Sequence, residues 1–147
     1  MTDYTPLYPT NAVIEERVKQ FISAFYAVSD DVSKNNEWVD YFTSDAILII
    51  GGMTARGTQE IHELRKGMWE KIKSRKHKPD KVFPASFEPA AAHQPEPEWS
   101  FEYMLSGSLD LQMKTGEKAV AQWAGRAVLR ETDGRLRYAF YQVYLHT

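Results

Sequence analysis

The first regular pattern in the chain is a run of apolar residues spaced three or four positions apart. Its members are Ile14, Val18, Phe21, Ile22 and Phe25. This spacing predicts an amphipathic helix that ends near Val28, with Asn11 as its capping residue. Polar residues then break the pattern, and a second, short helix is predicted to carry Trp38, Tyr41 and Phe42 on one side. The preceding residues 1–10, which include two prolines, are predicted to form an extended arm.

The middle of the chain mixes both kinds of pattern. The run "AILII" (46–50) is short and rich in β-branched residues, and two glycines follow it, so it predicts a strand that ends in a turn. A third helix is predicted to begin at 57–58 and to end at Pro79. Its expected apolar face is Ile61, Leu64, Met68 and Ile72. "KVFPAS" (81–86) predicts a short strand, and the proline-rich segment 86–98 predicts a loop.

The last third of the chain alternates apolar and polar residues, which is typical of strands that have one buried face. Three strands are predicted, and the "TDGR" sequence between the last two is a strong hairpin signal. Gly107 and Gly125 lie inside these strands, where glycine favours a bend or a close approach. Helices followed by an antiparallel meander indicate one α+β domain over residues 1–147, with a sheet that packs flat against the helices or curls around them.

Composition narrows the class of protein. The chain has 147 residues, a formal net charge of −2, 13% aromatic residues and no cysteine. Disulfides and thiolate chemistry are therefore excluded, and the near-neutral charge argues against nucleic-acid binding. No apolar run is long enough to cross a bilayer, and the N-terminus does not resemble a signal peptide, so a cytoplasmic protein without membrane contact is expected.

The order of elements resembles the cone-shaped fold of the nuclear transport factor two superfamily, and within it the SnoaL-like family, especially a fungal branch. The similar stretches are "FYAVSDD" (25–31), "YFTSDAILIIGG" (41–52), residues 56–83, "QWAGRA" (122–127) and "FYQVYLHT" (140–147). The resemblance implies a curved antiparallel sheet wrapped around the N-terminal helices, a cavity for a small apolar molecule, and a homodimer formed through the outer sheet face. The same fold carries cyclases, isomerases, dehydratases and plain binding modules.

A more distant similarity to the scytalone dehydratases suggests which residues carry chemistry. It aligns His77 with a catalytic histidine and Asp30 with the carboxylate that partners it. An imidazole can carry a proton near neutral pH, and Tyr41, alongside Tyr26 or Tyr103, is a candidate donor to a substrate oxygen. The alternatives stay open: His77 as a structural residue, and Asp30 as a turn residue that bonds its own backbone. The second histidine of those dehydratases has no counterpart in "AVAQWAGRAV" (119–128).

Aromatic residues are expected on every element that faces the cone. The candidate lining residues are Tyr26, Trp38, Trp69, Phe83, Tyr103, Trp123 and Tyr141. Aromatic stripes are more often core than binding site, but the mouth of a curled sheet is not filled by its own side chains alone. No histidine pair has metal-ligand spacing and no nucleotide-binding motif is present, so neither a metal nor a cofactor is expected.

Basic residues gather between Arg65 and Lys81. A solvated outer face of the third helix is the simplest interpretation, and attraction of an anionic ligand is the alternative. The loop at 86–98 is either a lid over the cone or a functionless insertion. The leading hypothesis is a protein that binds a small hydrophobic, polyketide- or terpenoid-like molecule. If it is catalytic, the expected chemistry is cofactor-free acid/base isomerisation, cyclisation or dehydration. The competing hypothesis is a non-catalytic binding or dimerisation module.

Overall fold

The computed structural model of the chain describes residues 3–87 and 100–146. Three helices and a six-stranded sheet make up this part, and the strands lie in the order β2-β1-β6-β5-β4-β3. The helices are α1 (Glu16–Ser29), α2 (Asn35–Val39) and α3 (Gly57–Gly67). The strands are β1 (Phe42–Ile50), β2 (Met53–Arg56), β3 (Ile72–Ala85), β4 (Ser100–Met113), β5 (Lys118–Thr132) and β6 (Arg135–His146). The predicted α+β class is confirmed, with one difference: β1 pairs with β6 in parallel, so the sheet is mixed.

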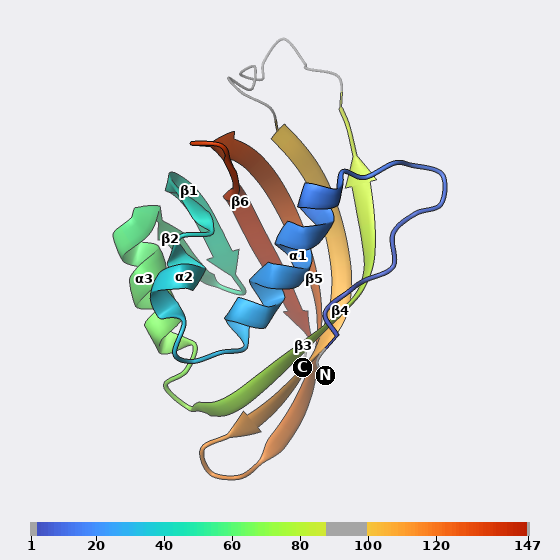
Figure 1. Cartoon of the computed structure of the whole chain (residues 1–147). Coiled ribbons are helices and arrows are strands. Elements are labelled where there is room, and N and C mark those ends of the chain that lie inside the picture. Colours follow the sequence, from blue (N-terminus) through green and yellow to red (C-terminus); the bar gives the residue numbers. More distant parts are fainter. Residues whose placement is uncertain (1–2, 88–99, 147) are drawn as a thin grey trace.

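The sheet curves strongly, and α1 lies along its concave face (Figure 1). Helices α2 and α3 lie to one side, beside β1 and β2, and the N-terminal arm runs on the opposite side of α1. The sheet therefore wraps around the helices, as the cone-shaped resemblance implied. Among the described residues, no helix combines the length and the apolar character that crossing a membrane would require.

Helix α1 begins later than its sequence pattern predicts. It starts at Glu16, and Glu15 before it has an extended backbone (φ −58°, ψ 140°), so Asn11 as the helix cap is wrong. Ile14, which precedes the helix, is nevertheless buried in the same core as the apolar face of α1. The apolar spacing thus identified the buried residues correctly but overstated the length of the helix, because an extended entry segment can bury an apolar side chain as well.

The largest departure from the predictions is the basic stretch after α3. The third helix ends at Gly67 instead of Pro79, and residues 72–85 form β3, which pairs with β4 from Ile72 opposite Met113 to Ala85 opposite Glu102. Pro79 lies at an irregularity of this ladder, on an edge strand of the sheet. Proline is tolerated there because no inner ladder depends on its missing N–H. The lysines of the stretch suit an edge strand, where charge discourages pairing with other chains.

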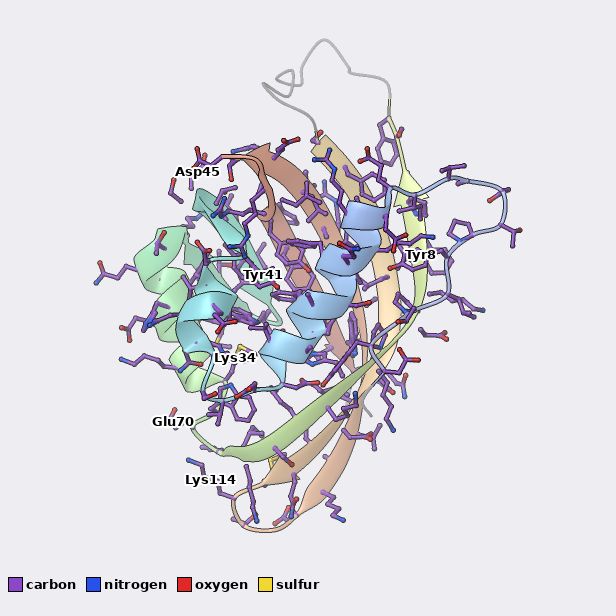
Figure 2. All side chains as sticks on the ribbon, viewed as in Figure 1. Tyr8, Lys34, Tyr41, Asp45, Glu70 and Lys114 are labelled. Carbon is purple, nitrogen blue, oxygen red and sulfur yellow. The ribbon has the colours of Figure 1, made fainter. Side chains whose placement is uncertain are left out.

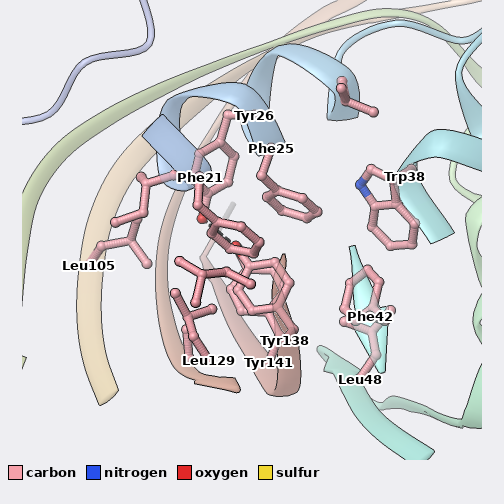
Figure 3. Packing of buried hydrophobic residues seen from close by; sticks show 14 of the residues in the cluster. Phe21, Phe25, Tyr26, Trp38, Phe42, Leu48, Leu105, Leu129, Tyr138 and Tyr141 are labelled. Carbon is pink, nitrogen blue, oxygen red and sulfur yellow. Dashed lines mark hydrogen bonds between the residues drawn. The ribbon is translucent and has the colours of Figure 1, made fainter. Parts of the chain in front are cut away.

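Aromatic rings fill the space between α1 and the sheet. Phe21, Phe25 and Tyr26 of α1 meet Tyr138 and Tyr141 of β6, and the ring centroids of the last two are 4.6 Å apart (Figure 3). Phe25 packs edge-on against both β6 tyrosines, a geometry that the charge distribution of aromatic rings favours. A continuous cluster of aromatic rings therefore joins α1 to β6 within the core.

Both predicted glycine positions mark close approaches, as expected. A Cβ atom at Gly107 would lie 2.5 Å from the Lys78 carbonyl oxygen and 2.8 Å from Cζ2 of Trp123. A Cβ atom at Gly125 would lie 3.0 Å from the Tyr141 ring. The β5–β6 hairpin turn is also confirmed, since Asp133 and Gly134 both have positive φ, as the tight turns that join twisted strands require.

Candidate functional site

The side chains of His77 and Asp30 form a hydrogen-bonded pair. Nδ1 of His77 lies 2.6 Å from Oδ1 of Asp30, and the backbone N–H of His77 donates to Oδ2 at 2.7 Å. The His77 side chain is 14% exposed and that of Asp30 is 5% exposed. Because both carboxylate oxygens are engaged and largely withdrawn from water, the ring of His77 has one defined orientation relative to α1. We call these two residues the His77–Asp30 pair.

Asp30 owes its position to the end of α1. It is the residue that terminates the helix, and its backbone N–H donates to the carbonyl of Tyr26. The guanidinium of Arg65, from α3, donates to the carbonyls of Val28, Ser29 and Asp31. Helix ends leave carbonyls without partners, and a cation satisfies them while complementing the helix dipole. Arg65 therefore fixes the backbone on either side of Asp30.

Arg65 is itself fully buried, so the prediction that it lies on a solvated basic face is wrong. Its guanidinium lies between the rings of Trp38 and Trp69, at 5.2 and 5.4 Å from their centroids. Burial lowers its pKa to about 10. The guanidinium of Arg75 also contacts the Trp69 ring, at 5.2 Å, and burial lowers its pKa as well. Two of the predicted surface cations are thus structural.

Two aromatic rings wall the His77 imidazole. Tyr26 lies 5.1 Å from it between ring centroids, and Trp123 lies 5.7 Å away in an edge-on arrangement. Trp123 reaches this place because Gly107 leaves room for its ring, and its indole N–H donates to the Ser108 carbonyl. Within the described part of the chain, Nε2 of His77 has no hydrogen-bond partner. This is the ring nitrogen that faces away from Asp30.

Behind His77 the interior contains four buried tyrosines, which we call the tyrosine cluster. Its members are Tyr26, Tyr103, Tyr138 and Tyr141. The hydroxyls of Tyr26 and Tyr141 are 2.7 Å apart and share a hydrogen bond. Those of Tyr103 and Tyr138 lie near each other, but within the described part of the chain neither has a hydrogen bond of ordinary geometry. Burial is the largest cause that raises the pKa of all four phenols, so each stays a neutral hydroxyl near neutral pH.

Tyr138 was not predicted from the sequence. Strict alternation along β6 would put Tyr138 and Tyr141 on opposite faces of the sheet. The β5–β6 ladder has an irregularity between Val128 and Leu129, and it brings both tyrosines to the concave face. A bulge of this kind adds one residue to a strand and inverts the side-chain alternation beyond it. No local sequence signal marks this one.

The other predicted site residues lie elsewhere. Trp38 is buried and donates to the Ser29 hydroxyl, and Trp69 is buried between two arginines. Tyr41 contacts Phe21, Phe25 and the Arg135 guanidinium, and it does not meet His77. Figure 2 labels Tyr41 on the side of α1 opposite Tyr8. Phe83 points to the outer face of the sheet and is 56% exposed.

Several polar residues weighed in the sequence have local partners. Asp31 accepts from the backbone and side chain of Ser33, which is a turn motif. His62 lies 3.3 Å from the amide oxygen of Asn36. His93 and most of the predicted 86–98 loop fall outside the described residues. In the described ranges, no three His, Cys, Asp or Glu side chains are grouped closely enough to hold a metal ion.

A surface hollow of about 370 Å³ adjoins the pair on the carboxylate side. It opens between the N-terminal arm, the end of α1 and the start of β3. Its lining residues are Tyr4, Ala27, Asp30, Asp31, Val32, Trp69, Lys73 and Ser74. The hollow therefore reaches the Asp30 side of the pair, and His77 is not among its lining residues.

No protein-family model matches the chain, and no curated protein sequence matches it. Solved structures do resemble it. A candidate scytalone dehydratase from Novosphingobium aromaticivorans superposes with a TM-score of 0.74 at 8% identity, covering 89% of this chain and 83% of that one. A hexachlorocyclohexane dehydrochlorinase, LinA type 2, gives 0.73 at 10% identity, with coverages of 89% and 84%.

A third structure is a candidate calcium/calmodulin-dependent protein kinase II association domain from Xanthomonas campestris. It gives a TM-score of 0.73 at 14% identity and covers 97% of this chain and 96% of that one. At such identities the likeness shows the fold alone, which is the cone-shaped α+β fold of nuclear-transport-factor-two-like proteins. The neighbours include catalysts and an association domain, and none supports the fungal branch suggested by the sequence.

Proposed function

We propose that this protein is a cofactor-independent acid/base enzyme that acts on a small hydrophobic molecule bearing a carbonyl or hydroxyl oxygen. The observation that carries the proposal is the 2.6 Å contact between Nδ1 of His77 and the Asp30 carboxylate at a partly buried position. His77 is the proton acceptor and donor, and Asp30 orients it. Isomerisation, cyclisation and dehydration are the reaction types that need only such proton transfers.

The geometry of the pair explains how His77 would serve as a base. An ionised carboxylate only accepts hydrogen bonds, so the shared proton belongs to Nδ1. The lone pair of the neutral ring is then on Nε2, the nitrogen that has no hydrogen-bond partner in residues 3–87 and 100–146. After Nε2 takes a proton, the nearby carboxylate stabilises the imidazolium. The same nitrogen can later return the proton, so that one residue acts first as base and then as acid.

The tyrosine cluster supports the choice of substrate class. Its phenols are neutral and buried, and one of them, Tyr26, contacts His77. The hydroxyls of Tyr103 and Tyr138 have no partner of ordinary geometry among the described residues. Neutral donors in apolar surroundings stabilise negative charge that develops on a substrate oxygen. We assign Tyr26 the role of first donor, because its ring contacts the His77 imidazole. Tyr41, which packs on the other side of α1, has no role in this proposal.

A direct test follows proton transfer itself, so it does not depend on which compound is the natural substrate. The protein is incubated in D₂O with a panel of small cyclic ketones and hydroxylated aromatic compounds, and loss of exchangeable C–H signals is followed by NMR. His77→Gln should slow the exchange of any active compound by about 10²–10⁴-fold, the usual contribution of a general base. His62→Gln is the matched control, because the His62 ring is hydrogen-bonded to Asn36 and not to the His77–Asp30 pair. Equal exchange rates in wild-type protein and His77→Gln would refute the assignment.

A second function, a non-catalytic module that pairs through the outer sheet face, is favoured by a separate observation. Phe83 and Met104 are opposite each other on neighbouring strands and are 56% and 42% exposed. Tyr144, farther across the same face, is 48% exposed. Exposed apolar side chains that gather on one face are typical of protein interfaces. Sedimentation should show a homodimer that Met104→Lys dissociates; a wild-type monomer at micromolar concentration would contradict this candidate.

A further inference from the structure

The Asp30 carboxylate has a third partner, which comes from the N-terminal arm. The hydroxyl of Tyr4 donates to Oδ2 of Asp30 at 2.8 Å. That oxygen also accepts the backbone N–H of His77, while Oδ1 faces the imidazole. The carboxylate is thus held at three points, two of which belong to His77 and the third to Tyr4.

The arm is attached to the body of the protein at Tyr4 itself and at Leu7. Leu7 bridges β3 in parallel: its N–H donates to the Asp80 carbonyl at 2.7 Å, and its carbonyl accepts from Val82 at 3.0 Å. The Ser23 hydroxyl donates to the Tyr4 carbonyl at 3.4 Å. These bonds place the Tyr4 side chain over the end of α1, next to the carboxylate.

The Tyr4 ring has its own contact with β3. The ammonium of Lys76 lies 3.5 Å from the ring centroid. This nitrogen has no hydrogen-bond partner among the described residues, and the face of the Tyr4 ring and the charge of Asp30 both stabilise it. The ring is therefore held between β3 and α1, and its hydroxyl can keep a fixed direction toward Asp30.

Tyr4 is suited to donate. Burial and the hydrogen bond to Asp30 both raise the pKa of its phenol, so it keeps its proton over the whole range in which the protein would work. A hydrogen bond from a phenol to an ionised carboxylate is charge-assisted and stronger than a neutral one. The bond restrains rotation of the carboxylate. With the two bonds from His77 alone, the carboxylate could move together with the histidine.

We propose that Tyr4 is a positioning residue of the candidate active site: it locks the Asp30 carboxylate, and through it the Nδ1–H tautomer of His77. The importance of Tyr4 for catalysis rests on the proposed function. Its effect on the His77 tautomer does not, because the tautomer can be measured without a substrate. The N-terminal arm is then part of the site, and its docking on β3 sets whether the pair is oriented.

The experiment is NMR on the full-length protein, with ¹⁵N-labelled histidine. The His77 signals are assigned by their loss in His77→Gln. Wild-type protein should give a downfield Nδ1–H proton and the ¹⁵N shifts of a single tautomer. Tyr4→Phe keeps the ring and the contact with Lys76 but removes the donor, and it should shift the Nδ1–H proton upfield and populate the Nε2–H tautomer. Tyr8→Phe, on the same arm, removes a hydroxyl that has no partner in the described residues and should match wild type.

A second variant undocks the arm without altering Tyr4. Leu7→Pro removes the N–H that bonds to Asp80, and it should reproduce the spectrum of Tyr4→Phe. Wild-type signals in both variants would overturn the role of Tyr4 while leaving the role of His77 intact. A wild-type spectrum without the Nδ1–H tautomer would overturn the orientation of the pair and with it this proposal. Unchanged turnover in His77→Gln, by contrast, bears only on the proposed function.

Discussion

Gly107 offers the sharpest test of how the fold supports the site. An alanine at this position would place its Cβ 2.5 Å from the Lys78 carbonyl oxygen and 2.8 Å from Cζ2 of Trp123. Real side chains do not tolerate such distances, and the nearer obstacle is backbone, which cannot rotate away. The change must therefore separate β4 from β3 next to His77, or displace the ring that walls the imidazole.

The size of the effect can be worked out by comparing three glycines. Overpacking a close-packed interior costs about 1–3 kcal/mol, and Gly107→Ala should cost about 3 kcal/mol because the strand itself must shift. Gly125→Ala meets only side-chain atoms, at 3.0 Å in Tyr141 and 3.2 Å in Leu105. It should cost about 1 kcal/mol, since alanine also restricts the unfolded chain. Gly52→Ala meets nothing within 4 Å, so its effect should stay within about 0.5 kcal/mol.

The assay is urea denaturation of wild type and the three variants, followed by tryptophan fluorescence. For a chain of this size, each kcal/mol lost from the free energy of unfolding should lower the melting temperature by about 2–4 °C. Calorimetry therefore gives an independent check. The expected order of loss is Gly107→Ala, then Gly125→Ala, then Gly52→Ala. If Gly107→Ala is as stable as Gly52→Ala, the close approach of β3 and β4 beside His77 is wrong.

Three further predictions concern the surroundings of the pair. Asp30→Ala should cost about 2–3 kcal/mol in urea denaturation, because it leaves a strand N–H without its charged partner, whereas Asp31→Ala should cost clearly less. Arg65→Lys should cost about 2–3 kcal/mol, since an ammonium cannot reproduce the planar set of bonds to three carbonyls; recovery of wild-type stability would contradict the structural role of this cation. The tyrosine cluster has raised pKa values in the folded state, so its contribution to stability is complete below the ordinary phenol value of 10.0 and is lost as the pH rises above it. Denaturation at increasing alkalinity should therefore coincide with the ionisation of these phenols in ultraviolet difference spectra, and early ionisation without unfolding would show that the cluster is open to water.

Much of the fold was predictable because periodicity reports burial directly. The α1 apolar face, the three long strands and the Asp133–Gly134 turn all follow from local patterns. Strand β3 did not, because its lysines match the polar face of a helix as well as that of an edge strand. Only its pairing with β4, far along the chain, decides between them, and no local pattern contains that information.

The site divides in the same way. His77 and Asp30 were selected by resemblance, and the structure brings them within hydrogen-bond distance although 47 positions separate them. The roles assigned to them stay predictions. Tyr4 and Tyr138 were missed for opposite reasons: the first lies in an arm without periodicity, and the second lies beyond a bulge that inverts periodicity. Arg65 was taken for a surface cation because a single arginine on a helix carries no signal of burial.

The position of Arg65 has a consequence for the order of folding. The Arg65 guanidinium bonds to three carbonyls beside Asp30, and 34 to 37 positions of the chain separate Arg65 from them. Contacts between distant positions form late, because the entropy of closing the intervening loop must be lost first. The long hairpins of β4, β5 and β6 join nearer neighbours. Refolding should therefore yield a species with these hairpins formed before the carboxylate reaches its final place, so that ligand binding would return more slowly than sheet structure.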